Sequence, residues 1–303
     1  MTFVKPADSR PVLSLDIGGT KTLAALVQDG QVLEECVLPT QMNGDPQAWV
    51  DQAAQATQPW RGQYSRVAAA VSGWVSKGMW SPLNTRTLNF QQGFALQQCL
   101  SQTFECPAWA INDAQAAAWG EYRYGAARNQ DMLFLTLSTG LGGGMVIHGQ
   151  LHLGREGLAG HVGVTANPQS SNTTESHLED TLSGRWMASQ ALALGHGALN
   201  AKQIFALADQ GLPWAQTLTQ QVAQKFAAVC AQLQWIIAPE CVVVGGGIGL
   251  APSFLPMVER CLGDVSQAWR PLLRPAVLGS RAGVIGVADH ACMTQLSTVT
   301  ETP

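Results

Sequence analysis

The sequence predicts an α/β protein built from two similar halves. Short apolar runs, typical of buried strands, alternate with longer segments of helical periodicity. An apolar strand, a turn containing glycine and threonine, and a second apolar strand occur at residues 12–28 and again about 120 residues later, at 132–148. With 303 residues, 46% of them hydrophobic, the chain can bury the cores of two domains. We therefore expect two domains of similar construction, each directing its glycine-rich turn toward a shared cleft.

The first half contains five predicted strands and three predicted helices. The strands are expected at residues 12–16, 23–28, 31–38, 66–71 and 108–111. Asp29-Gly30, between the second and third of them, is a favoured two-residue hairpin turn. The helices are expected at residues 46–60, 94–104 and 113–127. A polar, turn-rich segment at residues 72–93 separates the first two helices.

The second half is more helical. Strands are expected at residues 132–137, 145–148 and 241–244, and helices at 178–194, 201–210 and 214–237. Residues 164–177 form a polar loop without periodicity. We expect an N-terminal α/β domain at residues 1–112, completed by a returning helix near 283–293, and a larger C-terminal α/β domain at 113–282.

Composition excludes several classes of protein. The net charge of −4 argues against a nucleic-acid partner, because phosphate binding needs clustered lysine and arginine. The seven cysteines are odd in number and lack metal-ligand or redox spacing, which favours a reduced compartment. The N-terminus lacks the apolar region of a secretion signal, and no apolar run approaches the length of about 18 residues that a membrane span needs. We expect a cytoplasmic protein with no membrane partner.

The first candidate site is the turn D-I-G-G-T-K at residues 16–21. Gly18 and Gly19 lack a Cβ, so their backbone N–H groups could approach an anion closely. Thr20 adds a hydroxyl, and Asp16 could hold a hydrated Mg²⁺ ion. The alternative is an ordinary hairpin with a polar residue at its mouth.

The second candidate, S-T-G-L-G-G-G at residues 138–144, repeats this arrangement. It is neither a Walker A loop nor a dinucleotide-binding fingerprint, because the residues that define those motifs are absent. Two matching turns indicate a phosphate clamp more strongly than either turn would alone.

Three further patterns each allow two interpretations. Asn112-Asp113 could cap a helix or supply a general base with a neighbouring hydroxyl-binding amide. The glycines at 245–247 could lie beside an adenine and ribose or could simply turn the chain from strand to helix. His161 and Glu179 could bind a ligand, but a lone histidine is more often a structural or surface residue, and Glu179 at a helix start could simply favour the helix dipole.

The order of these motifs resembles the ROK family of sugar kinases. D-I-G-G-T-K, I-N-D-A-Q-A-A-A-W-G-E, S-T-G-L-G-G-G, G-L-A-G-H-V-G, L-E-D-T-L-S-G and V-V-V-G-G-G follow one another over about residues 12–290. The resemblance implies an actin-like, hexokinase-like ATPase fold of two α/β domains flanking a cleft. It also implies ATP and Mg²⁺ as cosubstrate and metal, a small sugar as substrate, and a homodimer.

The resemblance also implies a role for each matched residue. Asp113 would be the general base, and Asp16 would orient Mg²⁺. The residues expected to bind ATP and its phosphates are Asp16, Gly18, Gly19, Thr20, Lys21, Thr139, Gly140, Gly142, Gly245, Gly246 and Gly247. Those expected to bind the sugar are Ser72, Gly73, Asn84, Asn112, Asp113, His161 and Glu179.

The sequence departs from the family pattern in three places. Leu158 stands where many members carry a sugar-binding glutamate, and Thr87 where many carry a second asparagine. The cysteine motif that usually follows the Gly-His pair is replaced by S-S-N-T-T-E-S-H, which contains no cysteine. His161 and His177 alone do not make a closed tetrahedral site, so we expect no structural zinc.

Within the family, the segments N-D-A-Q-A-A-A-W, G-L-A-G-H and A-K-Q-I-F-A-L-A-D-Q-G most resemble members that act on N-acetylmannosamine. The expected reaction is ATP-dependent phosphorylation of the 6-hydroxyl of that sugar. The alternatives are a kinase for N-acetylglucosamine, glucose or another hexose, and a weakly active or non-catalytic sugar sensor. A DNA-binding sensor is disfavoured, because only eleven residues precede the first strand at Val12.

Overall fold

The computed structural model describes residues 10–167 and 176–299. The chain divides into two compact units. Unit 1 comprises Met1–Tyr124, Leu151–Ala159 and Ser280–Pro303, and unit 2 comprises Gly125–Gln150 and Gly160–Gly279. Within the described ranges, every helix is too short or too polar to span a lipid bilayer.

Unit 1 contains a five-stranded sheet in the order β3-β2-β1-β4-β7. The strands are β1 (Val12–Ile17), β2 (Lys21–Gln28), β3 (Gln31–Pro39), β4 (Arg66–Val71) and β7 (Ala108–Asn112). β1, β2 and β3 form an antiparallel meander, whereas β4 runs parallel to both β1 and β7. All five expected strands are confirmed. So is the Asp29-Gly30 turn, whose two residues have φ angles of 50° and 77°, as a tight hairpin turn requires.

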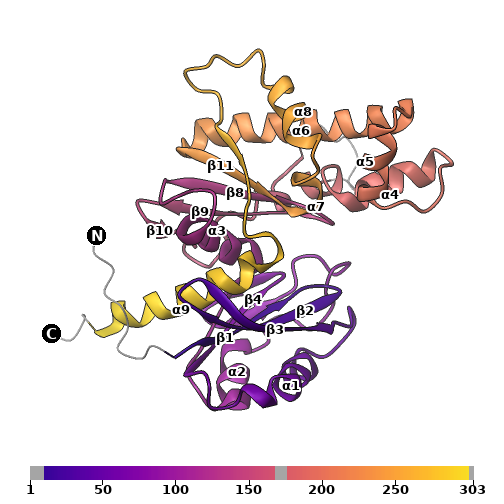
Figure 1. Ribbon diagram of the computed structural model, residues 1–303. Coiled ribbons are helices and arrows are strands. Elements are labelled where there is room, and N and C mark those ends of the chain that lie inside the picture. The colour runs from indigo at the N-terminus through magenta and orange to yellow at the C-terminus, as the bar shows by residue number, and fades with distance from the viewer. Residues whose placement is uncertain (1–9, 168–175, 300–303) are drawn as a thin grey trace. The chain divides into compact units, whose positions relative to one another are not determined.

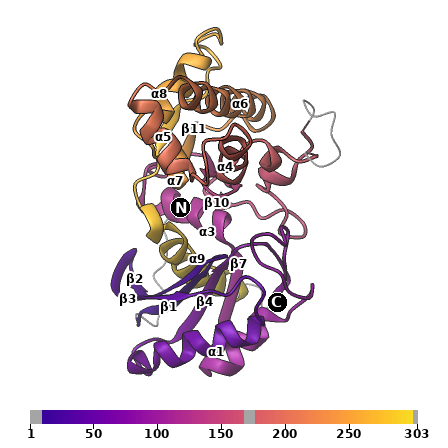
Figure 2. The same cartoon turned by 90° about the vertical axis from the view of Figure 1, so that its right-hand side faces the viewer.

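Helices cover both faces of this sheet. In Figures 1 and 2, α1 (Pro46–Ala56) and α2 (Leu96–Phe104) lie on one face, and α3 (Asp113–Tyr124) and α9 (Ala282–Val299) on the other. A short 3₁₀ helix, η1 (Gln58–Trp60), follows α1. The expected division at residues 112 and 113 stays a prediction; in the structure α3 groups with unit 1, because it packs along α9.

The turn-rich segment at residues 72–93 contains a hairpin that the sequence did not predict. Its strands are β5 (Trp74–Ser76) and β6 (Met79–Ser81). Lys77 and Gly78, with φ angles of 50° and 79°, make its two-residue turn. Strands of three residues are too short to show a period-2 pattern, which explains why the sequence indicated only a polar segment.

Unit 2 repeats the plan of unit 1. Its sheet has the order β10-β9-β8-β11-β12, with β8 (Met132–Leu137), β9 (Leu141–Ile147), β10 (Gln150–Leu151), β11 (Cys241–Gly245) and β12 (Leu273–Pro275). β8 and β9 form an antiparallel hairpin, and β8, β11 and β12 are parallel. The duplicated strand–turn–strand pattern of the sequence therefore reflects two sheets of the same topology.

The helices of unit 2 pack on this sheet and on one another. They are α4 (Gly184–Ala193), α5 (Ala201–Asp209), α6 (Pro213–Ile237), α7 (Gly246–Gly249) and α8 (Phe254–Cys261), with the 3₁₀ turns η2 (Val162–Val164) and η4 (Leu178–Asp180). The 3₁₀ turn η5 (Gly279–Arg281) spans the boundary between the two units. Their mostly aliphatic core includes three phenylalanines, and the centroid of the Phe254 ring lies 5.3 Å from that of Phe226 and 6.1 Å from that of Phe205.

The expected helices at 201–210 and 214–237 are confirmed, but the one at 178–194 is wrong in its first third. The chain there makes the 3₁₀ turn η4 and begins helix α4 only at Gly184. Ser183 causes this break, because its extended backbone and its hydroxyl, which accepts from the Trp186 N–H, cap the new helix.

Two glycines allow α3 and α9 to approach each other. A Cβ on Gly286 would lie 1.8 Å from the Ala116 carbonyl oxygen, and one on Gly120 would lie 2.6 Å from that of Ala282. Next to this crossing the Asp289 carboxylate accepts from Trp119 Nε1 at 2.8 Å and from Arg123 Nε at 3.0 Å. α9 therefore depends on α3 for both packing and polar contacts.

Gly286→Ala separates helix propensity from packing. Propensity alone would stabilise a helix interior by about 1 kcal/mol, whereas the clash with Ala116 should destabilise unit 1 by about 2 kcal/mol or more. Urea denaturation measures the difference. Ala206→Gly at an exposed position of α5 calibrates the propensity effect. A variant more stable than the wild-type protein would contradict the close approach of α3 and α9.

Candidate active site

The expected sugar and magnesium residues of unit 1 gather at one edge of its sheet. β1, β4 and β7 are parallel, and Val71 of β4 is opposite Ile17 of β1 and Asn112 of β7. The carboxyl ends of these three strands therefore bring together Asp16, the Ser72-Gly73 pair and Asn112-Asp113. In open α/β sheets ligands bind at this edge.

Asn112 organises this edge. Its side chain is buried, with 6% exposed, and its Nδ2 donates to the Gly73 carbonyl at 2.8 Å and to Asp113 Oδ1 at 2.9 Å. Its Oδ1 accepts from the N–H groups of Ala114 and Gln115. The helix-capping interpretation is therefore confirmed for Asn112. The same bonds hold the adjacent carboxylate of Asp113.

The orientation of Asp113 is fixed at one oxygen. Oδ1 accepts from the Ala114 N–H at 2.8 Å in addition to Asn112 Nδ2. These two donors hold the carboxylate in one orientation, as a general base requires.

Asp16 is the second carboxylate of this edge. Burial, reinforced by the negative charge of Asp113 and opposed by Lys21, raises the pKa of Asp16 to about 7. A Cβ on Gly283, in the first turn of α9, would lie 2.7 Å from Asp16 Oδ2. A buried carboxylate close to a second one is a donor set that suits a divalent cation, since such a cation would offset the cost of ionisation.

The Gly18-Gly19 turn needs glycine for close packing. Neither residue has a positive φ, and the Gly18 N–H donates to the Lys21 carbonyl at 3.0 Å. A Cβ on Gly19 would lie only 2.7 Å from the Thr87 carbonyl oxygen. Thr87 belongs to a loop that starts at Asn84, whose carbonyl accepts hydrogen bonds from the N–H groups of Thr87 and Leu88. The expected phosphate turn and the loop that carries Asn84 are therefore neighbours within unit 1.

In unit 2, Glu179 lies directly on the β8–β9 turn. Its Oε2 accepts from the Leu141 N–H at 2.9 Å, and its Oε1 pairs with the Arg185 guanidinium. A Cβ on Gly140 would overlap the carboxylate, at 2.1 Å from Oε2. The backbone N–H of Arg185 also donates to the Thr139 carbonyl. The structure therefore joins expected sugar and phosphate residues in one cluster.

Gly245, Gly246 and Gly247 turn the chain from β11 into α7, so the strand-to-helix interpretation is confirmed. Gly246 has a φ of 85°, and a Cβ there would meet the Leu137 carbonyl oxygen at 2.3 Å. A Cβ on Gly247 would meet nothing within 4 Å, which leaves room at its backbone for a planar group. Because β8 and β11 are parallel, the turn at Gly245–Gly247 and the turn of the β8–β9 hairpin, which Gly142 follows, lie at the same edge of the sheet.

His161 follows a close crossing of two glycine segments. Gly160 has a φ of 90°, and a Cβ there would lie 2.8 Å from the Gly143 carbonyl oxygen of β9. His161 then precedes η2, and its carbonyl accepts from the Val164 N–H at 3.3 Å. The histidine is thus fixed beside β9.

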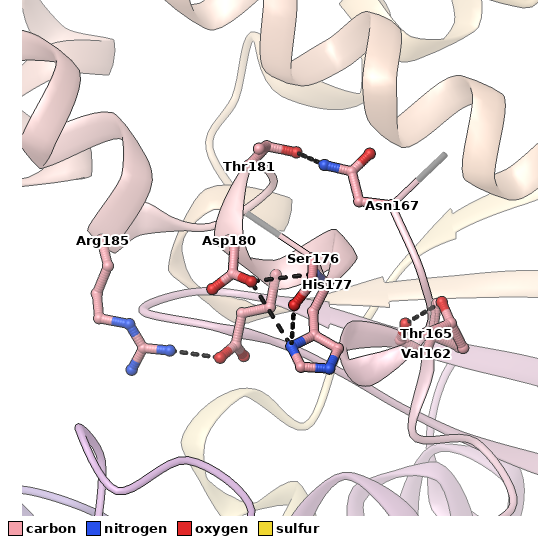
Figure 3. Close-up of polar contacts among 9 residues, drawn as sticks. Val162, Thr165, Asn167, Ser176, His177, Asp180, Thr181 and Arg185 are labelled. Carbon is pink, nitrogen blue, oxygen red and sulfur yellow. Dashed lines mark hydrogen bonds and ion pairs between the residues drawn. The ribbon is translucent and has the colours of Figure 1, made fainter. Parts of the chain in front are cut away.

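Hydrogen bonds join the chain on either side of residues 168–175, which lie outside the described residues (Figure 3). The Asn167 N–H donates to the Ser176 carbonyl at 2.8 Å, and Asn167 Nδ2 donates to Thr181 Oγ1 at 3.0 Å. The His177 N–H donates to Asp180 Oδ2 at 3.0 Å. The described part of the chain holds no group of three or more histidine, cysteine or acidic residues arranged for a metal. We call the contacts of Asn167, Ser176, His177, Asp180 and Thr181 the 167–181 clasp.

Sequence reasoning missed three residues near these sites. Arg185 pairs with Glu179, and Glu156 and Gln115 hold the segment that precedes Gly160. A single glutamine in an alanine-rich helix was the one available signal for Gln115. The partners of Arg185 and Glu156 come from separate segments and leave no local pattern.

The structure therefore forms two groups of the expected residues. Unit 1 brings together Asp16, Gly18, Gly19, Thr20, Lys21, Ser72, Gly73, Asn84, Asn112 and Asp113. Unit 2 brings together Thr139, Gly140, Gly142, His161, Glu179, Gly245, Gly246 and Gly247.

Two of the relatives that match most of this chain show its similarity to known enzymes. The bifunctional enzyme NanE/NanK of Brucella melitensis biotype 1 is 44% identical over 93% of this chain, which spans only 54% of that protein. The N-acetylmannosamine kinase of Escherichia coli O1:K1 is 40% identical over 91% of this chain and 96% of its own length. The chain thus spans about half the length of the first relative and nearly all of the second.

Structural comparison agrees with the sequence relatives. A ROK family glucokinase from Streptomyces griseus, solved in complex with glucose and AMPPNP, superposes with a TM-score of 0.79 at 28% identity, over 92% of this chain and 98% of that one. The expected actin-like, hexokinase-like ATPase fold is confirmed. The ROK family profile itself matches residues 12–293. This chain belongs to the ROK family.

Proposed function

We propose that this chain transfers the γ-phosphoryl group of ATP to the 6-hydroxyl of N-acetylmannosamine. The observation that carries the proposal is the 40% identity with an N-acetylmannosamine kinase over nearly the whole of both chains. The ordered carboxylate of Asp113 supports an active kinase rather than a sugar sensor. The protein would act in the cytoplasm as a homodimer.

Asp113 would accept the proton of the sugar hydroxyl as the transferred group leaves ATP. Asn112 and the Ala114 N–H hold Oδ1, so the carboxylate needs no reorientation when the sugar binds. Asn112 would also meet a neighbouring hydroxyl. The remaining sugar contacts would come from Ser72, Gly73, Asn84, His161 and Glu179.

The glycine turns would hold the nucleotide. Gly18, Gly19, Thr20, Lys21, Thr139, Gly140 and Gly142 would surround the phosphates, with Gly245, Gly246 and Gly247 beside the nucleoside. Asp16 would hold Mg²⁺ through a carboxylate, which is how this ion usually binds proteins. When bound, the ion neutralises charge that develops on the phosphates. The chain's own part is to position the reacting groups and exclude water.

A panel of sugars tests the substrate. We expect ADP release with Mg²⁺-ATP to give the highest kcat/KM for N-acetylmannosamine, with lower values for N-acetylglucosamine, glucose and mannose. Sites that bind a substrate polar group discriminate strongly against analogues that lack it. A higher kcat/KM for glucose would replace the proposal with a glucokinase. No sugar-dependent ADP release would refute kinase activity.

Asp113→Asn tests the base. The amide keeps an acceptor for the Ala114 N–H but cannot take the proton, so we expect kcat to fall by about 10²- to 10⁴-fold while the fold persists. Steady-state kinetics and thermal melting measure both. Asp45→Asn, at the exposed N-cap of α1, is the matched control and should retain activity. Normal turnover in Asp113→Asn would remove Asp113 from the mechanism.

Asp16→Asn should separate stability from activity. The folded protein raises the pKa of Asp16 from 3.8 to about 7. Stability from this carboxyl is therefore fully present below pH ~4, and it is lost as the pH rises from about 4 to 7, because only the unfolded chain ionises the group readily there. The variant should therefore melt about 3 °C or more above the wild-type protein at pH 8 and match it below pH ~4.

The same variant should lose most Mg²⁺-dependent turnover, since it lacks the proposed ligand charge. Melting curves at several pH values and kinetics over a Mg²⁺ series provide the measurements. Asp264→Asn, at an exposed position, serves as the control. A lower melting temperature for Asp16→Asn at pH 8 would show that the ionised carboxylate stabilises the fold.

A further inference from the structure

The Ser72-Gly73 turn follows β4 directly and has an unusual backbone. Gly73 has a φ of 118°, which residues with a side chain rarely adopt. A Cβ on Gly73 would lie only 2.6 Å from the Ser81 carbonyl oxygen of β6. Glycine loses more conformational freedom on ordering than any other residue, so this turn keeps one conformation only if its neighbours hold it.

Two buried side chains hold the two carbonyls of this turn. Asn112 Nδ2, from β7, donates to the Gly73 carbonyl at 2.8 Å. The indole Nε1 of Trp80, from β6, donates to the Ser72 carbonyl at 3.0 Å. The Ser72 N–H in turn donates to the Ile17 carbonyl of β1 at 3.1 Å. The orientation of the turn is therefore set from three sides, and Trp80 is the side chain that fixes the Ser72 carbonyl.

Trp80 is itself held firmly. Its side chain is fully buried, and the centroid of its ring lies 4.5 Å from that of Phe90 and 5.7 Å from that of Trp49. The Trp80 N–H donates to the Phe94 carbonyl at 2.7 Å. The Trp80 carbonyl accepts from the N–H groups of Phe94 and Gly93. A ring packed in this way stays in one rotamer, so its N–H points in a fixed direction.

The same indole also packs against the loop that carries Asn84. Phe90, whose ring it contacts, closes that loop, and Thr87 of the loop lies against Gly19 of the glycine turn. The N–H of Trp80 therefore holds one segment of the candidate site, and its ring supports a second. Because different atoms of one side chain make these contacts, a substitution can remove the first and retain the second.

We propose that Trp80 is a positioning residue for the acceptor sugar, and that its indole N–H holds the Ser72-Gly73 turn in the conformation that receives the sugar. The inference rests on the proposed function. Trp80 is fully buried, so it acts through the turn rather than on the sugar itself. The turn would hold the sugar equally in the ground state and the transition state. Loosening it should therefore weaken sugar binding and leave the chemical step unchanged.

Trp80→Phe tests the positioning residue, because phenylalanine keeps an aromatic ring and lacks the N–H. The KM for N-acetylmannosamine should rise about 5- to 50-fold, while kcat changes by less than about 3-fold. The KM for ATP should stay within about 2-fold of the wild-type value, since the ring that supports the loop beside Gly19 is retained. Steady-state kinetics measure all three constants. A wild-type KM for the sugar in this variant would overturn the proposal.

Trp60→Phe is the matched control. Trp60 is 7% exposed, and its indole N–H donates to Glu34 Oε2 of β3 at 2.7 Å. Each variant loses one hydrogen bond of a buried indole, so both should melt about 2–4 °C below the wild-type protein. Only Trp80→Phe should raise the KM for the sugar. An equal rise in Trp60→Phe would show that lost stability, rather than lost positioning, weakens sugar binding, and would refute the role of Trp80.

Amide hydrogen exchange gives a readout that does not depend on any sugar. Exchange of the Ser72 amide should accelerate in Trp80→Phe and keep the wild-type rate in Trp60→Phe. If the wild-type protein phosphorylates no sugar, the proposed function fails, while faster exchange still supports the hold of Trp80 on the turn. If the wild-type protein is active and Trp80→Phe keeps both its KM and its exchange rate, the inference fails and the proposed function stands.

Discussion

The buried amide of Asn112 is the interaction on which the candidate site depends. Its two functional groups make four hydrogen bonds, to the Gly73 carbonyl just after β4, to Asp113 and to the first turn of α3. A buried amide with every bond made has one favourable orientation, because any rotation leaves polar groups unsatisfied. The strand ends, the helix start and the proposed base are therefore set by one side chain.

Glycine has a similar organising role, and mostly through close approach. Gly19 admits the Thr87 backbone, and Gly140 admits the Glu179 carboxylate, at distances that no Cβ permits. Neither residue has a positive φ. The glycine-rich turns are therefore fixed parts of their units, shaped by neighbours before any anion arrives. A preformed turn binds with less loss of conformational entropy than a flexible one.

The sequence revealed the sheets far better than the contacts around the site. Apolar runs such as those of β1 and β8 are strong local signals, and their repetition identified the shared topology of the two units. β5 and β6 were too short to detect, and Ser183 ended a helical pattern that composition alone would continue. The bonds of Gln115 span 42 and 44 residues, so no local pattern encodes them. Motif order identified the family, whereas the positioning contacts required coordinates.

The 167–181 clasp shows how this chain holds Glu179 in place. A structural zinc site contributes on the order of 10 kcal/mol from within its own loop, whereas each hydrogen bond of the clasp contributes only about 1 kcal/mol. The clasp draws on α6 as well: Lys225 Nζ donates to the Thr181 carbonyl at 3.2 Å and lies 4.2 Å from the Trp186 ring centroid. Glu179 lies between these anchored points. Its own bonds come from Leu141 of β9 and Arg185 of α4, and the neighbouring Thr181 is bound by Lys225 of α6, so the position of Glu179 is coupled to the folding of unit 2.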